Sequence, residues 1–117
     1  MKKSDLRTAD YIEHMLKAIA CIQEYVAPLS LETFGSTRIA IDAVVRNLEV
    51  LGEASRNVML GDPAFAASHP EIPWEDMYSM RNRISHGYFA INANTIWVTV
   101  QRDLPELERN LRCLKRA

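Results

Sequence analysis

The sequence has few of the residues that mark the commoner classes of small protein. Its 117 residues include two cysteines, Cys21 and Cys113, which form no CxxC pair and so argue against a zinc site built from adjacent cysteines. Both are expected to be reduced thiols in the core. No run approaches the roughly 18 apolar residues of a membrane span, and the basic N-terminus lacks the apolar segment of a signal peptide. A cytoplasmic location is therefore expected.

Several catalytic signatures are also missing. The sequence contains no GxxxxGK[ST] phosphate loop, no GxGxxG, no HExxH, no GxSxG and no cluster of paired aspartates. No cofactor and no metal ion are therefore expected. The composition, 48% hydrophobic and 25% charged, excludes a disordered chain and indicates one domain over residues 1–117. The net charge of −1 lacks the basic excess typical of nucleic-acid-binding proteins.

Apolar residues recur every three or four positions along most of the chain, which predicts helices. No segment alternates with a period of two, so strands are not expected. The fold class is therefore all-α, an antiparallel helical bundle of four main helices. The first is expected to run from Asp5, as its N-cap, until Pro28, the second over about residues 38–60, the third over about residues 74–86, and the fourth from a cap at Asn92 or Asn94 to the C-terminus.

Four residues refine this prediction. Gly52 and Ser55 give the second helix a small-residue face that another helix can approach closely. Thr37 is a candidate N-cap for the same helix. Pro105 is expected to kink the last helix, because it lacks a backbone N–H and its ring crowds the preceding turn. Residues 29–37 are expected to form a connection with room for one short helical turn, and residues 62–73 the least regular part of the chain.

The polar side chains that could carry chemistry are concentrated near the end of the third predicted helix. No Asp or Glu occurs between residues 77 and 102, where three arginines contribute +3, so the rest of the chain must carry −4. The near-neutral total therefore conceals one cationic stretch. Its candidate functional residues are Arg81, Asn82, Arg83, His86 and Tyr88.

Arginine and histidine together can cleave RNA without a metal ion. In such a reaction His86 takes the proton from a ribose 2'-hydroxyl, and Arg81 stabilises the charge that develops on the phosphate. The two residues are five positions apart, so on a regular helix their directions differ by about 140°. Either the helix unwinds before Gly87 or a second protomer completes the site. The dimer is preferred, because a two-fold axis would supply a second copy of His86.

Structural interpretations of the polar residues stay open at this point. Arginine and histidine near a helix C-terminus are favoured by the helix dipole alone. His14 and His69 are expected to be ordinary solvated histidines. Arg46, Asn47 and Glu53 in the second helix fit either a solvated helix surface or the lining of a cleft. The basic residues at the C-terminus fit either an extended RNA track or a cationic last turn favoured by the helix dipole: Arg109, Arg112, Lys115 and Arg116.

The segment from Arg81 to Tyr88, RNRISHGY, resembles the R-x4-H-x-Y motif of the HEPN superfamily. It is most similar to the HepT-like toxins, which form one half of the HepT/MntA toxin–antitoxin pairs of prokaryotes. The likeness covers about residues 5–112, in the same order along the chain. It includes AVVRNLEVLGEA (43–54), IPW (72–74), MRNR (80–83) and DLPEL (103–107).

The resemblance implies a helical bundle that dimerises through the motif region and acts as a metal-independent endoribonuclease toxin on RNA. Arg81 and His86 match the catalytic pair, while Asn82 and Arg83 are expected to support substrate binding. Tyr88 matches the tyrosine that a partner nucleotidyltransferase, the MntA-type antitoxin, modifies with AMP. Some HEPN proteins are binding modules, so the alternative is a non-catalytic module that binds a nucleotide or a substrate and works with a nucleotidyltransferase.

Overall fold

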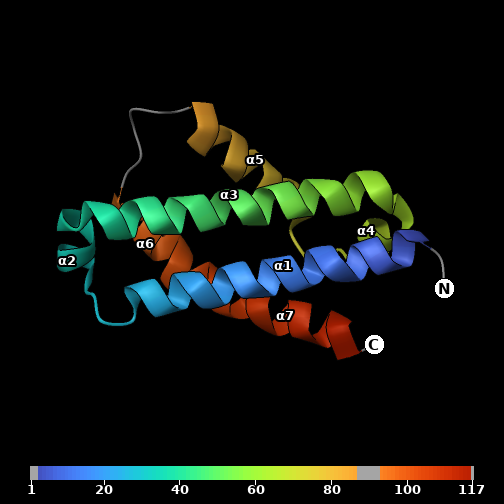
Figure 1. The fold of residues 1–117 in the computed structure, drawn as a ribbon, viewed down its shortest axis with the longest axis horizontal. Helices are drawn as coiled ribbons and strands as arrows, with labels where there is room; N and C mark the ends of the chain where they lie inside the picture. Colours follow the sequence, from blue (N-terminus) through green and yellow to red (C-terminus); the bar gives the residue numbers. More distant parts are fainter. Residues whose placement is uncertain (1–2, 87–92, 117) are drawn as a thin grey trace.

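A computed structural model describes the backbone of residues 3–86 and 93–116 and the side chains of residues 7–82 and 93–114. Its centre is a pair of long antiparallel helices, α1 (Lys3–Val26) and α3 (Arg38–Gly61), which lie side by side (Figure 1). Each helix has 24 residues, or about 36 Å at 1.5 Å per residue. The short helix α2 (Leu31–Ser36) lies between them in the chain and buries Phe34.

Two further helical segments pack against this pair. Helix α5 (Trp74–His86), which follows the short helix α4 (Pro63–Ser68), packs against α3. The C-terminal segment consists of α6 (Ala93–Val98), the π-helical stretch η1 (Thr99–Asp103) and α7 (Leu104–Arg116), and α7 packs against α1 (Figure 1).

The described residues form helices and contain no strand, which confirms the predicted all-α class and the antiparallel bundle. None of the helices in residues 3–86 and 93–116 is long and apolar enough to cross a membrane.

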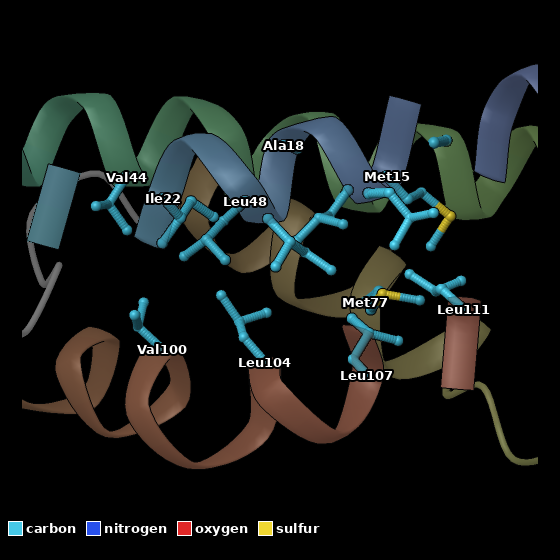
Figure 2. Packing of buried hydrophobic residues seen from close by; sticks show 14 of the residues in the cluster. Met15, Ala18, Ile22, Val44, Leu48, Met77, Val100, Leu104, Leu107 and Leu111 are labelled. Atoms are coloured by element: carbon cyan, nitrogen blue, oxygen red, sulfur yellow. The ribbon is translucent and has the colours of Figure 1, made fainter. Parts of the chain in front are cut away.

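The core is one cluster of apolar side chains where α1, α3, α5 and the C-terminal segment meet. Side chains from all four point into the space between the helices (Figure 2). The apolar residues that recur along the C-terminal segment form a seam, which is buried at Val100, Leu104, Leu107 and Leu111. Trp97 and Leu114 are partly buried against it. The cluster includes Met15, Ile22, Val44, Leu48, Met77, Val100, Leu104, Leu107 and Leu111.

One predicted helix cap is wrong. Helix α1 begins at Lys3, so Asp5 lies inside the helix and is not its N-cap. Of the two candidate caps for the last predicted helix, Asn94 lies inside α6, which begins at Ala93, and Asn92 lies outside the described residues, so the cap at Asn92 stays a prediction. Helix ends are harder to predict than helix interiors, because one residue's cap competes with its neighbours' helical propensity.

Two of the expected connections contain short helices. The short helical turn expected between α1 and α3 is present as α2. Thr37 lies between the end of α2 and the start of α3. Thr37 occupies the N-cap position of α3, as predicted, but its side chain makes no capping hydrogen bond to that helix; its hydroxyl donates instead to the Thr33 carbonyl at 2.6 Å. In residues 62–73, predicted to be irregular, the Asp62 side chain caps α4 and Pro63 occupies its first position, where a missing N–H costs nothing.

Pro105 disturbs the last predicted helix by widening it. The backbone is π-helical over η1, which ends two residues before Pro105, and the Leu104 N–H donates to the carbonyl of Thr99, five residues earlier. A proline ring crowds the carbonyl four residues before it, and a wider turn relieves that contact. The disturbance therefore lies where the sequence predicts it and takes the form of a π-helical turn.

The two cysteines occupy different environments, and neither forms a disulfide. Cys21 is half-buried on α1, whereas Cys113 is exposed on α7. The prediction that both lie in the core is therefore wrong for Cys113, because its position on α7 faces away from the seam formed by Leu107 and Leu111.

The predicted small-residue face of α3 is where α5 packs. Gly52 and Ser55 are both buried, and the Ser55 hydroxyl donates to the backbone carbonyl of Trp74 at 2.7 Å. The indole N–H of Trp74 lies within hydrogen-bonding distance of the Ala66 and His69 carbonyls, at 3.2 and 3.1 Å. The start of α5 is therefore anchored to α3 and to the connection that precedes it.

Replacing Ser55 with alanine should lower the free energy of unfolding by about 1–3 kcal/mol, because the buried Trp74 carbonyl loses its side-chain donor. Urea denaturation followed by circular dichroism measures the change. Ser68→Ala is the matched control, since its exposed hydroxyl donates only within α4 and its loss should cost less than about 0.5 kcal/mol. Equal stability of Ser55→Ala and the unmodified protein would contradict this assignment.

Candidate functional site

Residues 81–86 of the motif lie on the last two turns of α5. The helix continues to His86, so the backbone does not unwind before Gly87, and the angular separation of Arg81 and His86 on a regular helix stands. Of the predicted site residues, Arg81 and Asn82 are described with their side chains. The side chains of Arg83 and His86 and the whole of Tyr88 lie outside the described residues.

Arg81 is seated directly against Gly52 of α3. A Cβ atom on Gly52 would collide with the Cβ of Arg81 and would lie 2.8 Å from the Met77 carbonyl oxygen. Only a residue without a side chain leaves room for the two backbones at this distance. The Gly52 position therefore fixes how close Arg81 comes to α3.

The guanidinium of Arg81 is held by two neighbours. One nitrogen lies 3.4 Å from a carboxylate oxygen of Glu53, and another donates to the Asn82 side-chain oxygen at 3.3 Å. The Arg81 side chain is 33% exposed and that of Glu53 45%, so water reaches the pair. An exposed pair of this kind contributes little to stability, and a phosphate can compete with Glu53 for the guanidinium.

Tyr78 extends this network along α5. Two side-chain hydrogen bonds lower the pKa of the Tyr78 phenol below its ordinary value, because both favour the ionised form. The one from Asn82 has the larger effect and the one from Arg56 the smaller. The Arg56 guanidinium also lies over the Tyr78 ring, 5.8 Å from its centre. Arg56 of α3 and Arg81 and Asn82 of α5 thus act on the same phenol.

A cleft of about 270 Å³ opens beside Arg81, between α1, α3 and α5. We call it the Arg81 cleft. Its lining includes Tyr11 and His14 from α1, Arg46, Glu53 and Asn57 from α3, and Arg81 from α5.

The structure places the α3 residues for which the sequence leaves two interpretations open. Arg46 and Glu53 line the Arg81 cleft, whereas the Asn47 amide donates to the Ala43 carbonyl of its own helix at 2.9 Å and is not part of the lining. At the C-terminus, Arg112 is exposed and pairs with Glu108 at 3.0 Å.

Sequence reasoning did not assign four polar or aromatic residues of this cleft to the site: Tyr11, His14, Glu49 and Asn57. His14 is exposed, as expected, but its ring lies in the cleft with Arg81. The spacing of Tyr11 and His14, three apart on one helix, shows that they share a face but not which helix that face meets. The charge pattern of the sequence is incomplete for the same reason. Residues 77–102 contain no acidic residue, but the fold brings Glu53 of α3 next to Arg81.

The fold and the site together define an all-helical domain whose cationic motif is presented near the end of one helix. The chain belongs to the ribonuclease HepT-like family, whose model matches residues 15–114. That match contains the whole segment from Arg81 to Tyr88.

Two relatives span nearly the whole chain. It is 36% identical over 107 residues to "Probable ribonuclease HepT" from Thermococcus cleftensis, which covers 92% of this chain and 94% of that protein. It is 34% identical over 102 residues to "Putative RNase TTE0752" from Caldanaerobacter subterraneus subsp. tengcongensis, covering 87% and 88% of the two chains. No solved structure is significantly similar to it.

Gly52→Ala should push α5 away from α3 and displace Arg81, at a cost of about 1–3 kcal/mol in the free energy of unfolding. Gly61→Ala is the matched control on the same helix, because a Cβ there meets nothing within 4 Å and alanine is the better helix former. Chemical denaturation of both variants tests the assignment. Equal effects of the two substitutions would show that close packing at Gly52 does not constrain α5.

Proposed function

We propose that this chain is a metal-independent endoribonuclease toxin, the toxin half of a toxin–antitoxin pair, and that it acts as a homodimer. The observation that carries the proposal is the placement of Arg81: a partly exposed guanidinium, seated on α3 and shared with Glu53, on the same helix as His86. Membership of the ribonuclease HepT-like family supports RNA as the substrate.

In the proposed reaction, His86 accepts the proton of a ribose 2'-hydroxyl, and the 2'-oxygen attacks the adjacent phosphorus. The new bond from the 2'-oxygen to phosphorus forms as the bond to the 5'-oxygen of the next nucleotide breaks. That leaving oxygen takes up a proton, so the products carry a 2',3'-cyclic phosphate and a 5'-hydroxyl. Arg81 leaves Glu53 to bind the phosphate and stabilises the charge that builds up in the transition state, with Asn82 and Arg83 supporting the phosphate.

A homodimer suits this chemistry for a geometric reason. Because α5 is regular up to His86, one helix directs Arg81 and His86 about 140° apart. Two copies of the motif facing each other across a two-fold axis would let the arginine of one protomer serve the histidine of the other. The second histidine would then be available to protonate the leaving oxygen.

Regulation is proposed to act through Tyr88. An MntA-type nucleotidyltransferase would transfer AMP to its phenol, placing a phosphate and a base two residues from His86. The added negative charge would offset the arginines, and the nucleotide would occupy space that the RNA needs.

Incubating the purified chain with labelled RNA in EDTA should yield products with 2',3'-cyclic phosphate ends. His86→Ala and Arg81→Ala should each reduce cleavage by at least about 100-fold, since each removes a group that acts in the transition state. His69→Ala is the matched control, because His69 pairs with the exposed Glu71 at 3.1 Å. No cleavage of any RNA, with nucleotide binding retained in His86→Ala, would support the non-catalytic binding module instead.

Adenylylated protein should cleave RNA at least about 10-fold more slowly than the unmodified protein, because the phosphate of AMP opposes RNA binding. Tyr88→Phe removes the acceptor oxygen, so this variant should take up no AMP and should keep its cleavage activity after treatment with the nucleotidyltransferase and ATP. Mass spectrometry of the treated protein follows the modification. Equal cleavage by modified and unmodified preparations would contradict this regulation.

A further inference from the structure

The Arg81 cleft contains groups that the proposed cleavage reaction does not use. Helix α1 contributes two rings, those of Tyr11 and His14, whose centres are 6.2 Å apart and whose planes meet at 73°. The Tyr11 hydroxyl accepts a hydrogen bond from Arg7 at 3.1 Å, which helps to fix that ring. Asn57 of α3 lies in the same cleft and forms no hydrogen bond within the described part of the chain.

The charges of the cleft suit a nucleobase better than a phosphate. Its two arginines, Arg46 and Arg81, are matched by two glutamates, Glu49 and Glu53. A phosphate placed deep in the cleft would meet both carboxylates, and like charges at short range repel. An uncharged base avoids that cost while using the same donors and acceptors.

The size and chemistry of the cleft also fit a single base. A volume of about 270 Å³ lies at the small end of ligand sites, which suits one ring system rather than a longer ligand. Proteins recognise unstacked RNA bases by stacking them on aromatic rings and by hydrogen bonds to their edges. A free carboxamide is the side chain that pairs a donor and an acceptor with the edge of adenine.

We infer that the Arg81 cleft is a base-binding subsite that takes one adenine of the RNA, next to the phosphate held by Arg81. Tyr11 and His14 provide the ring surfaces, and Asn57 reads the edge of the base. The inference rests on the proposed function and adds to it a base preference at the cut. A strand would then be positioned by its phosphate at Arg81 and by its neighbouring base in the cleft.

Binding measured separately from cleavage tests this subsite. In a His86→Ala background, fluorescence anisotropy with labelled oligoadenylate and oligouridylate reports affinity without loss of the RNA. His14→Ala and Asn57→Ala should each weaken the binding of oligoadenylate by about 5- to 10-fold, which is the low end of the range for losing one base–ring contact. Each should weaken the binding of oligouridylate by less than about 2-fold. His14→Phe keeps a ring and should retain most of the affinity for oligoadenylate.

Lys17→Ala is the matched control, since Lys17 is exposed on α1, lies outside the cleft and loses a full positive charge. It should change both affinities alike and by less than about 2-fold. Equal weakening of both oligonucleotides by His14→Ala and Asn57→Ala, or no weakening by either, would overturn the subsite. Adenine-selective loss in a chain that cleaves no RNA would overturn the ribonuclease proposal and leave the subsite standing.

Discussion

The contact between α3 and α5 at Gly52 is the constraint on which the candidate site depends. The absence of a side chain at this position lets the two helices meet where Arg81 leaves α5. Three residues along α3, the Ser55 hydroxyl binds the first turn of α5 through the Trp74 carbonyl. Because α5 is anchored at its start and packed closely at its middle, the motif at its end has a defined position relative to α3.

This packing changes the electrostatics that the sequence alone suggests. Residues 77–102 contain no acid, yet Arg81 lies 3.4 Å from the carboxylate of Glu53, which α3 brings to it. The pair is partly exposed, so water screens it and an incoming phosphate can replace it. In the proposed reaction, an arginine held in this way would have a defined orientation before the phosphate arrives and would still offer its donors to it. The acidic residue Glu53 of α3 and the arginine of the cationic motif therefore belong to one network of interactions.

Most of the fold could be predicted because it follows from local periodicity. The spacing of apolar residues identifies the helices over residues 38–60 and 74–86, which the structure has as α3 and α5. The spacing predicts helix ends less well, as at Asp5, where a candidate cap competes with helical propensity. Pro105 could be recognised as a disturbance, but the form of that disturbance depends on how η1 accommodates the proline ring while Val100 and Leu104 stay in the core.

The sequence by itself determined the helical class, the small-residue face of α3 and the motif with its cationic surroundings. Each is encoded in neighbouring residues, through periodicity, side-chain size or charge. The tertiary structure decided which side chains join Arg81. Tyr11, His14 and Asn57 come from helices that are distant in the chain, and their place in the cleft depends on how α1, α3 and α5 pack, which no local pattern records.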